Sequence, residues 1–555
     1  MSAHRKLRRR ALPVVASALV AVLVPAAPAF ARPPGPHYDF RLLAKAKPDE
    51  CFAGVGEPYP AGPPCATGQP KVNQAYVWGL AQVGKKIWFG TGANVNCIVS
   101  GATLNLIKPS INDDWVCEYG QSQLAKQNPT LPPSIGDQRA PQVFYYDTKA
   151  GKLVDKTADI DSKSSDDAYR RKTTLGLRAG GAFQGVVLLA GPGLGTVINL
   201  FAFDGETGEY LGSSSLTTAG NIRHFFVAAG ALYAGVGVGR NGDSGGHVLR
   251  WTGSRSNPFS FVNVADLPAQ AADLTYFNDR LYVSTWPRTS PTGTDQLAGL
   301  WMSPPLHGGH PGLRDTDAGG WQQVWNASQY EPDPVIAATY GLGGLAAYNG
   351  QLYWGTMHVP MKATTVFETV YPQPQGDATK AAIKNTQRAL SVFRGRDFGT
   401  GHQRVELLYG ESALPAYDPA TATWSAKPTG YTPKYGASGF GNPFNNYEWI
   451  MTVTAGKLFV GTMDWSYIAH YLLPPGQGNI DPSIYGGDLW AFDCDGPAEA
   501  VSTTGVGNYL NYGVRNMIPD GSTVYLGMAN PMNLRTDPND AVPDGGWELI
   551  KMNVK

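Results

Sequence analysis

The chain has 555 residues with 44 basic and 44 acidic side chains, a length that one ordinary hydrophobic core rarely serves. Removing a basic leader, predicted below, leaves 39 basic against 44 acidic residues, which excludes a general nucleic-acid-binding protein because such a protein needs a basic surface. Glycine (67 residues) and proline (43 residues) are abundant and only 16% of residues are charged, a composition typical of many short strands and turns rather than of long charged helices.

Residues 1–31 are predicted to be a secretory signal peptide. A basic stretch at residues 5–10 precedes an apolar run from Ala11 to Val24, and small residues frame a cleavage site at residues 29–31. The apolar run is too short to cross a bilayer comfortably, and no later stretch approaches that length. We therefore expect a secreted, extracellular protein with no stable insertion into a membrane.

Residues 32–72 are predicted to form an N-terminal segment ahead of the main domain. Within it, residues 38–46 (YDFRLLAKA) have the character of a strand. We expect this strand to pair with the last repeat of the chain, where it would cover an otherwise bare sheet edge.

The five cysteines of a secreted chain favour disulfides. Two close pairs stand out, Cys51 with Cys65 and Cys97 with Cys117, although four cysteines allow three connectivities and the spacing does not choose among them. Cys494 is left over and follows an apolar strand pattern, so we expect it to be a buried, inert thiol.

A pattern that recurs along the chain is the strongest signal in the sequence. It consists of a short turn followed by a strand that reads apolar, aromatic, apolar, glycine. Turns such as Asn-Gly and Asp-Gly supply the positive φ that tight hairpins need. The copies begin at Gly84, Phe183, Gly230, Asn278, Asn349, Ala455 and Asp520.

Each copy is preceded by one apolar strand and followed by another that ends in an outer aromatic residue, which predicts a four-stranded antiparallel blade. A single such sheet would expose two apolar faces, whereas blades packed around an axis bury both. The sequence therefore predicts an all-β fold, a seven-bladed β-propeller over residues 73–555, with its last blade closed by the N-terminal strand.

This repeat resembles that of the secreted bacterial β-propellers of the quinoprotein-like and YVTN-like kind, and the likeness covers about residues 73–555. The shared motif is a signature of the fold. The resemblance therefore implies a propeller and assigns no role to any particular residue.

The longest loops follow the second strand of each repeat and should share one face of a propeller, where loops on a rigid scaffold commonly carry function. Polar and aromatic residues near these loops are the candidates for a site. The candidate catalytic residues are Arg223, His224, His358 and Arg515. The candidate substrate-binding residues are Tyr76, Trp286, Glu448, Asp464, Trp465 and Asn530.

Each candidate also has a structural interpretation. The histidines could be hydrogen-bonded framework residues, and the tryptophans could be ordinary packing between blades. Arg223 and Arg515 stand in apolar strands and need either an acidic partner or an anionic ligand. Glu448 and Asp464 could be those partners.

Three functions are compatible with this pattern. The first is an enzyme acting on an extracellular polysaccharide, best a lyase in which arginines neutralise a uronate carboxylate while a histidine or tyrosine removes the adjacent proton. A glycosidase would instead use Glu448 with Asp464 or Asp273 as two facing carboxylates. The second is a noncatalytic module that recognises a glycan or a cell-surface protein, and the third is an envelope scaffold.

No cofactor and no metal site are predicted. His307 and His310 have a spacing that could hold a metal, but no third ligand is nearby. A loop with four oxygen-bearing side chains leaves calcium open as a possible ligand, although the loop lacks the EF-hand spacing. These residues are Asp537, Asn539, Asp540 and Asp544.

Overall fold

The structure is a computed structural model of the chain. It describes residues 37–104, 107–288, 296–306, 312–471, 480–536 and 543–555. The predicted signal peptide, residues 1–31, lies outside this part of the chain. Within the described residues, no helix has both the length and the apolar character needed to cross a membrane.

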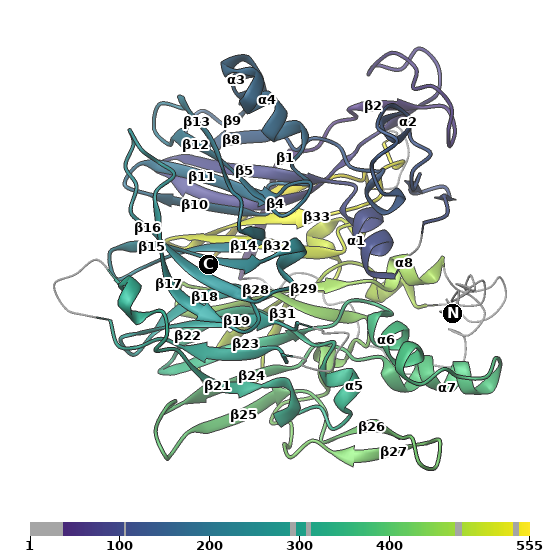
Figure 1. The fold of residues 1–555 in the computed structure, drawn as a ribbon, viewed down its shortest axis with the longest axis vertical. Helices are drawn as coiled ribbons and strands as arrows, with labels where there is room; N and C mark the ends of the chain where they lie inside the picture. Colours follow the sequence, from purple (N-terminus) through teal and green to yellow (C-terminus); the bar gives the residue numbers. More distant parts are fainter. Residues whose placement is uncertain (1–36, 105–106, 289–295, 307–311, 472–479, 537–542) are drawn as a thin grey trace, which may run out of the picture.

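Most strands form antiparallel units of four that follow one another along the chain, and the N-terminal strand β1 joins the last unit (Figure 1). The first three units are β4 (Gln74–Val83), β5 (Lys86–Ala93), β8 (Val143–Asp147) and β9 (Lys152–Asp155); β10 (Ala179–Phe183), β11 (Val186–Pro192), β12 (Ile198–Asp204) and β13 (Tyr210–Leu216); and β14 (Ala219–Ala228), β15 (Ala231–Val238), β16 (Gly246–Trp251) and β17 (Phe261–Leu267). The next two are β18 (Gln270–Phe277), β19 (Arg280–Trp286), β20 (Gly299–Met302) and β21 (Gln322–Asn326); and β22 (Gly341–Tyr348), β23 (Gln351–Met357), β24 (Val392–Arg396) and β25 (Arg404–Tyr409). The last two are β28 (Asn445–Thr454), β29 (Lys457–Asp464), β30 (Leu489–Asp493) and β31 (Glu499–Ser502); and β32 (Gly513–Asp520), β33 (Thr523–Ala529), β34 (Glu548–Val554) and β1 (Tyr38–Lys45).

The second strand of each unit is buried on both faces because a neighbouring unit packs against each side. In β5 every residue from Ile87 to Ala93 is buried. The core between the first two units illustrates the packing, since Trp88 of β5 lies 5.1 Å from Phe203 of β12 between ring centroids. These sheets, packed face to face, are those of a β-propeller, which confirms the all-β propeller architecture that the repeat predicted.

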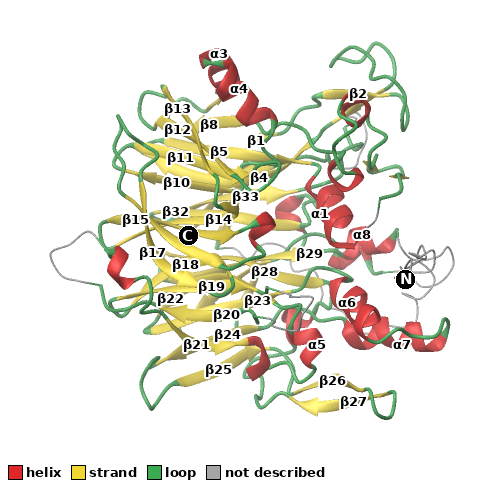
Figure 2. Cartoon of the chain, in the orientation of Figure 1, coloured by secondary structure: helices red, strands yellow, loops and turns green. Residues whose placement is uncertain are grey.

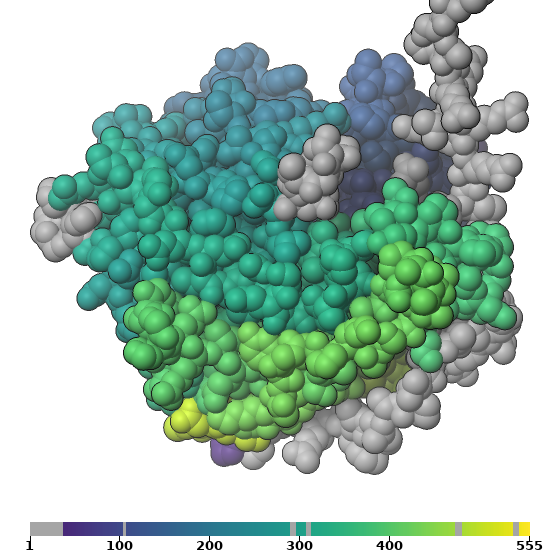
Figure 3. Space-filling view, turned by 60° about the horizontal axis from the view of Figure 1, so that its bottom comes forward, coloured from purple at the N-terminus to yellow at the C-terminus, as the bar shows by residue number. Residues whose placement is uncertain are grey.

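The N-terminal strand β1 belongs to the same sheet as the end of the chain. It runs antiparallel to β34, with Tyr38 opposite Val554 and Lys45 opposite Glu548. In Figure 3 purple N-terminal atoms accordingly lie beside yellow C-terminal atoms at the lower edge of the molecule.

Most helices gather on one side of the strands, at the right in Figure 2. Three of them directly follow second strands: α1 (Val95–Leu104) follows β5, α6 (Lys362–Val370) follows β23, and α8 (Ser466–His470) follows β29. The long connections thus cover one face. The remaining helices are α2 (Gln123–Gln127), α3 (Thr157–Lys163), α4 (Ser165–Lys172), α5 (Pro334–Ala337) and α7 (Asp377–Thr386), and the short hairpins are β2 (Glu50–Phe52) with β3 (Gln69–Lys71), β6 (Ser110–Ile111) with β7 (Val116–Cys117), and β26 (Ala413–Asp418) with β27 (Thr423–Pro428).

Disulfides join Cys51 to Cys65 and Cys97 to Cys117, which are the two close pairs in the sequence. The expectation that Cys494 is buried is wrong, because its side chain is exposed. β30 ends one residue earlier, at Asp493, and Cys494 occupies the left-handed region of a turn with φ of 55°. The apolar strand pattern therefore stops before the cysteine, which projects into solvent.

Candidate functional site

A cavity of about 460 Å³ lies where the innermost strands of the units meet the helices of the covered face. Its walls combine aromatic rings with basic side chains, and of the described residues that line it none is an aspartate or a glutamate. The basic and aromatic residues of the lining are Tyr76, Trp78, Lys108, Trp115, Tyr119, Arg178, Arg223, Trp286, Tyr447, Trp449, Trp465, Tyr512 and Arg515. This is a volume and a composition suited to a small polar ligand.

β-Bulges on the innermost strands place the side chains at the centre. In β14 the pairing with β15 passes from Ile222 to His224 and leaves Arg223 unpaired. The same shift leaves Trp78 unpaired in β4, Trp449 in β28 and Arg515 in β32. A bulge redirects a side chain relative to the sheet, so one residue from each of these strands turns toward the axis.

Three arginines lie over tryptophan rings in this cavity. The guanidinium carbon of Arg223 is 3.6 Å from the ring centroid of Trp286. Arg178 stands 5.6 Å from Trp78, and Arg515 stands 5.6 Å from Trp449. These are cation–π contacts, which hold a cation without neutralising it. The arrangement therefore leaves positive charge available to a ligand.

Burial dominates the electrostatics of the three arginines, although the charge of Asp273 opposes the shift in the pKa of Arg515. Burial lowers the pKa of Arg178 to about 9 and that of Arg515 to about 10, and it lowers the pKa of Arg223 well below its usual range. Repulsion among the three guanidinium groups adds to the shifts of Arg178 and Arg223. Within the described part of the chain, the Nε atom of each has no hydrogen-bond partner. An anion bound among them would reverse these costs.

A second, much smaller hollow of about 20 Å³ adjoins the cavity and shares Arg223, Trp449 and Arg515 with it. His224 and Asp273 also line this hollow, with Nδ1 of the histidine 3.6 Å from Oδ1 of the aspartate. Its volume is that of a single water molecule. The hollow is thus too small for a sugar.

Glu448 is fully buried and lies outside the lining of both spaces. Its side chain packs against Gly343 and Gly344 of β22, and a Cβ atom at Gly343 would come within 1.8 Å of the Glu448 carbonyl oxygen. Burial raises the pKa of the Glu448 carboxyl well above its usual range, and nearby Asp273 adds to the shift. Glu448 therefore does not supply the charge that the arginines of the cavity lack.

The structure brings five predicted residues to the cavity: Tyr76, Arg223, Trp286, Trp465 and Arg515. Trp286 is fixed there because its Nε1 donates a hydrogen bond to the carbonyl oxygen of Leu342, at 3.0 Å. His224 reaches only the small hollow.

Three other predicted residues have framework positions outside the cavity lining. His358 is buried, and its Nε2 lies 2.8 Å from Oγ1 of Thr356. Burial and the charge of Arg388 lower the pKa of His358 to about 3, so the ring is neutral. Asp464 accepts a hydrogen bond from Asn442 at 2.8 Å, and Asn530 donates to Asn511 at 3.2 Å.

Five central residues of the lining are not among the candidates named from the sequence: Trp78, Arg178, Tyr447, Trp449 and Tyr512. Trp78 lies on β4, and Tyr447 and Trp449 lie on β28, while Arg178 and Tyr512 directly precede β10 and β32. Tyr447 lies close enough to Arg178 and Arg223 for their charges to oppose the rise in its pKa that burial causes. One signal could have found Arg178 and Trp78, since both stand at the same place in the repeat as Arg223.

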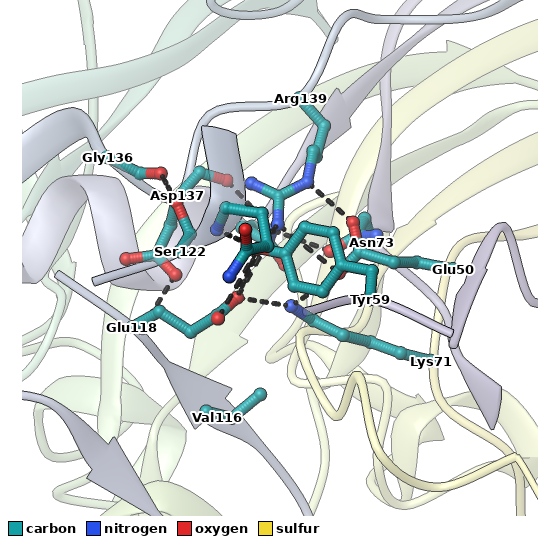
Figure 4. A network of polar contacts seen from close by, with 12 residues as sticks. Glu50, Tyr59, Lys71, Asn73, Val116, Glu118, Ser122, Gly136, Asp137 and Arg139 are labelled. Carbon is teal, nitrogen blue, oxygen red and sulfur yellow. Dashed lines mark hydrogen bonds and ion pairs between the residues drawn. The ribbon is translucent and has the colours of Figure 1, made fainter. Parts of the chain in front are cut away.

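A buried ionic network supports the part of the cavity wall that comes from the connection between β5 and β8 (Figure 4). Nζ of Lys71 lies 3.0 Å from Glu118 and 3.2 Å from Glu50. Arg139 pairs with Glu50 at 2.8 Å and donates to the hydroxyl of Tyr59 at 2.8 Å. The network ties the N-terminal segment to the insertion between β5 and β8.

The same insertion positions residues of the cavity wall directly. The Asp137 carboxylate accepts the backbone N–H groups of Glu118 and Tyr119, at 2.7 and 2.8 Å. The disulfide between Cys97 and Cys117 joins α1 to β7. Cys117 and Tyr119 both line the cavity, so this wall is held covalently and by buried hydrogen bonds.

No group of three His, Cys, Asp or Glu side chains gathers as metal ligands within the described ranges. His307, His310, Asp537, Asn539 and Asp540 lie outside them. Asp544 is described, and its carboxylate pairs with Lys45.

No protein-family model and no curated protein matches this chain. Solved structures resemble it at low sequence identity. An ancestral GH74 enzyme matches with a TM-score of 0.36 and 9% identity over 92% of this chain and 52% of its own, so this chain spans about half the length of that enzyme. The β-propeller domain of the trilobed protease from Pyrococcus furiosus matches with a TM-score of 0.35 and 8% identity over 83% of this chain and 91% of its own. A hypothetical selenium-binding protein from Sulfolobus tokodaii matches with a TM-score of 0.36 and 10% identity over 75% of this chain and 87% of its own.

Proposed function

We propose that this β-propeller binds an anionic glycan outside the cell, with an acidic group of the ligand held by the arginines of the cavity. One observation carries the proposal: Arg178, Arg223 and Arg515 converge on a space whose described lining contains no carboxylate. A desolvated cation without an acidic partner costs free energy, and a bound anion removes that cost. A carboxylate matches the geometry of a guanidinium group, which can bind it through two hydrogen bonds at once.

The aromatic lining explains why the ligand is a sugar and not a bare ion. Trp78, Trp286, Trp449 and Trp465 surround the arginines with flat apolar surface, and Tyr76 is also present. A pyranose ring has apolar C–H faces and polar edges, so rings and guanidinium groups together match both parts of an acidic sugar. The enclosed shape suits a small acidic group better than it suits the surface of a partner protein or a scaffold contact.

The two disulfides favour an oxidising compartment, in line with the predicted leader. We therefore place the proposed binding outside the cell, where acidic polysaccharides occur on cell surfaces and in matrices.

We further infer that the propeller has seven blades and that β1 closes the ring. The innermost strands contact one another in the cyclic order β4, β10, β14, β18, β22, β28, β32 and back to β4. β1 supplies the outer strand of the unit that contains β32, β33 and β34. These contacts support one closed ring over residues 73–555, with residues 32–72 as a segment attached to it.

Binding can be tested by titrating the purified protein with galacturonate oligomers and, as a neutral comparison, with maltooligosaccharides. We expect only the acidic oligomers to change the tryptophan fluorescence, with an affinity that weakens as ionic strength rises. Arg223→Gln should weaken binding by about 10- to 100-fold, because a hydrogen bond to a charged group contributes about 1.5–3 kcal/mol.

The matched control is Arg404→Gln, which changes an exposed arginine on β25. It should bind like the unaltered protein. Equal binding of the neutral and acidic oligomers, or undiminished binding by the Arg223 variant, would contradict the proposal.

Cleavage of the bound glycan by β-elimination is a second candidate, favoured by the position of Tyr447. Its phenol lines the cavity beside Arg178 and Arg223. In that reaction Tyr447 first releases its hydroxyl proton to water, and its oxygen then removes the proton from the carbon next to the carboxylate. The electron pair forms a C=C bond, the C–O bond to the next sugar breaks, and the departing oxygen takes up the proton now held by the phenol. The histidines of the lyase hypothesis are placed less well, since His224 lines the small hollow and His358 lines neither space.

The elimination has a direct readout in the ultraviolet absorbance of its unsaturated product. Tyr447→Phe should abolish product formation and leave binding within about threefold, because the ring stays in place and only the hydroxyl is lost. A Phe variant that still forms product would exclude Tyr447 as the base. A glycosidase is supported less, because neither Glu448 nor Asp464 lines the cavity and Asp273 reaches only the small hollow.

A further inference from the structure

We propose that the cavity takes the end of an acidic glycan chain, or a single acidic sugar, and not the interior of a polymer. This inference rests on the proposed function and names the part of the ligand that is recognised. It follows from the shape of the cavity, which is blocked along the axis, roofed by helices, and exposed at one margin.

The floor of the cavity blocks the axis of the propeller. Arg223, Trp449 and Arg515 separate the cavity from the hollow of about 20 Å³ beneath it. Arg223 of β14 is stacked on Trp286 of β19, with its guanidinium carbon 3.6 Å from the ring centroid. A sugar chain therefore cannot pass through the centre of the ring.

The roof is made by two helices that come from opposite sides of the ring. α1 follows β5, α6 follows β23, and the two helices contact each other. Val95 of α1 and Met361, which directly precedes α6, line the cavity and belong to one buried cluster. A polymer therefore cannot lie in the cavity from above without displacing this contact.

The exposed part of the lining lies beyond the middle of α1. Val99 has 37% of its surface exposed, and Lys108 and Ser110 are also exposed. By contrast, Tyr512 has 3% exposed and Arg515 has 5%. The cavity thus has an outer margin on one side and a deep end on the axis.

Charge is distributed along the same direction. Lys108 is at the exposed outer margin, whereas Arg178 and Arg223 are half-buried and Arg515 is buried. An acidic sugar that entered past Lys108 would come to rest with its anionic group at Arg223 and Arg515. The next sugar of its chain would then lie at the margin, which makes the last residue of the chain the one that is recognised.

The experiment compares two galacturonan samples of equal mass, one hydrolysed to chains about four times shorter than the other. A protein that binds chain ends responds to the number of chains. The shorter sample should therefore reach half-saturation at about one quarter of the mass concentration that the longer sample needs. Monomeric galacturonate should compete for the same site. Tryptophan fluorescence reports the binding, since five tryptophans line the cavity.

Equal half-saturation by mass for both samples would overturn the inference and leave the proposed function standing, because interior sugars would then be bound. Absence of binding to either sample would overturn the proposed function and this inference together.

A variant tests the roof directly. Met361→Ala, which removes a buried side chain from the contact between α1 and α6, should bring the two half-saturation values closer together. Lys384→Ala changes an exposed residue of α7 and should preserve the fourfold difference between the samples. An unchanged ratio in the Met361 variant, with binding intact, would show that the roof does not select chain ends.

Discussion

Arg388 and Arg223 show two ways in which this protein holds a guanidinium group away from water. Nε of Arg388 lies 2.7 Å from Glu331, whose carboxylate also accepts a hydrogen bond from Tyr340 at 2.8 Å. Arg223 has only the ring of Trp286. Within the described residues no ion pair involves it, so its charge costs free energy in the unliganded protein, as is common where a residue serves a ligand.

We therefore expect Arg223→Gln to stabilise the unliganded protein by about 1 kcal/mol while it weakens anion binding, because the substitution removes an uncompensated charge. Arg388→Gln should do the opposite and cost about 3–5 kcal/mol, since it leaves Glu331 buried without its partner. Calorimetric melting of both variants checks these signs. A lower melting temperature for Arg223→Gln would mean that this arginine stabilises the fold.

Two buried carboxyl groups make stability depend on pH in an unusual direction. Burial raises the pKa of Asp488 to about 7 and that of Asp464 to about 8, although hydrogen bonds from Asn445 and Ser466 oppose the shifts. The folded protein thus holds these protons more tightly than the unfolded chain, in which an aspartate has its ordinary pKa of 3.8. The contribution is fully present below that value and is lost as pH rises through the folded pKa values.

Asp488→Asn should reduce the loss of stability between about pH 5 and about pH 8 by about 2 kcal/mol, because the amide does not ionise. Urea unfolding at both pH values measures the change. Asp166→Asn, at an exposed position in α4, serves as the control and should leave the pH dependence as it is. A pH dependence that is the same in Asp488→Asn and the unaltered protein would contradict the role of this carboxyl.

At the scale of elements, the innermost strands explain why only part of the site could be predicted from the sequence. Side chains alternate between the two faces of a strand. A bulge of one residue shifts this alternation, so that different residues of the strand face the axis. Tyr447 and Trp449 line the cavity, whereas Glu448 between them turns into the sheet packing. Composition and spacing mark the neighbourhood of such residues, but they do not reveal a bulge.

The end of β29 also separates neighbouring residues between the cavity and the sheet packing, here without a bulge at Asp464. Met463 and Trp465 line the cavity, while Asp464 between them is fully buried and hydrogen-bonded to Asn442. The sequence predicted that both Asp464 and Trp465 bind the ligand. Only Trp465 lines the cavity. The predicted histidine His358 directly follows β23, but its ring is hydrogen-bonded to Thr356 and does not line the cavity.

The disulfide between Cys97 and Cys117 should matter for binding beyond its effect on stability, because Cys117 lines the cavity. Replacing both cysteines by alanine should cost about 3 kcal/mol and also weaken galacturonate binding several-fold, since α1 would no longer be held against β7. Replacing Cys51 and Cys65 should cost a similar free energy, because the loops are of similar length, and leave the affinity unchanged. Denaturant unfolding and fluorescence titration separate the two effects, and equal affinities for both double variants would contradict them.

At the scale of the whole molecule, the repeat made the propeller predictable. Each copy of the hairpin coincides with a second strand of the structure, from β5 (Lys86–Ala93) to β33 (Thr523–Ala529). Turn residues and buried apolar strands are local properties that one sequence displays directly. Which side chains meet at the centre depends on strands hundreds of residues apart, and that information is absent from any single repeat.

The pairing of β1 with β34 brings the two ends of the described chain together and should govern the stability of the whole ring. Deleting residues 37–46 exposes the edge of β34 and removes the buried Tyr38, so we expect a lower melting temperature and aggregation through the open edge. Leu42→Ala, at a side chain that is 49% exposed in the same strand, should change stability by only about 0.5 kcal/mol. Melting and light scattering measure both effects, and an unchanged melting temperature after the deletion would show that the ring does not depend on this strand.

The unpaired residues of the bulges have one more consequence. Trp78, Arg223, Trp449 and Arg515 each point inward from a strand whose other residues hold the sheets together. Selection can therefore change one side chain of the central cavity at a time, while the packing of the sheets stays the same. A combinatorial library randomised at these four positions should yield well-folded proteins with new preferences for small molecules, which would make this scaffold a starting point for engineered receptors.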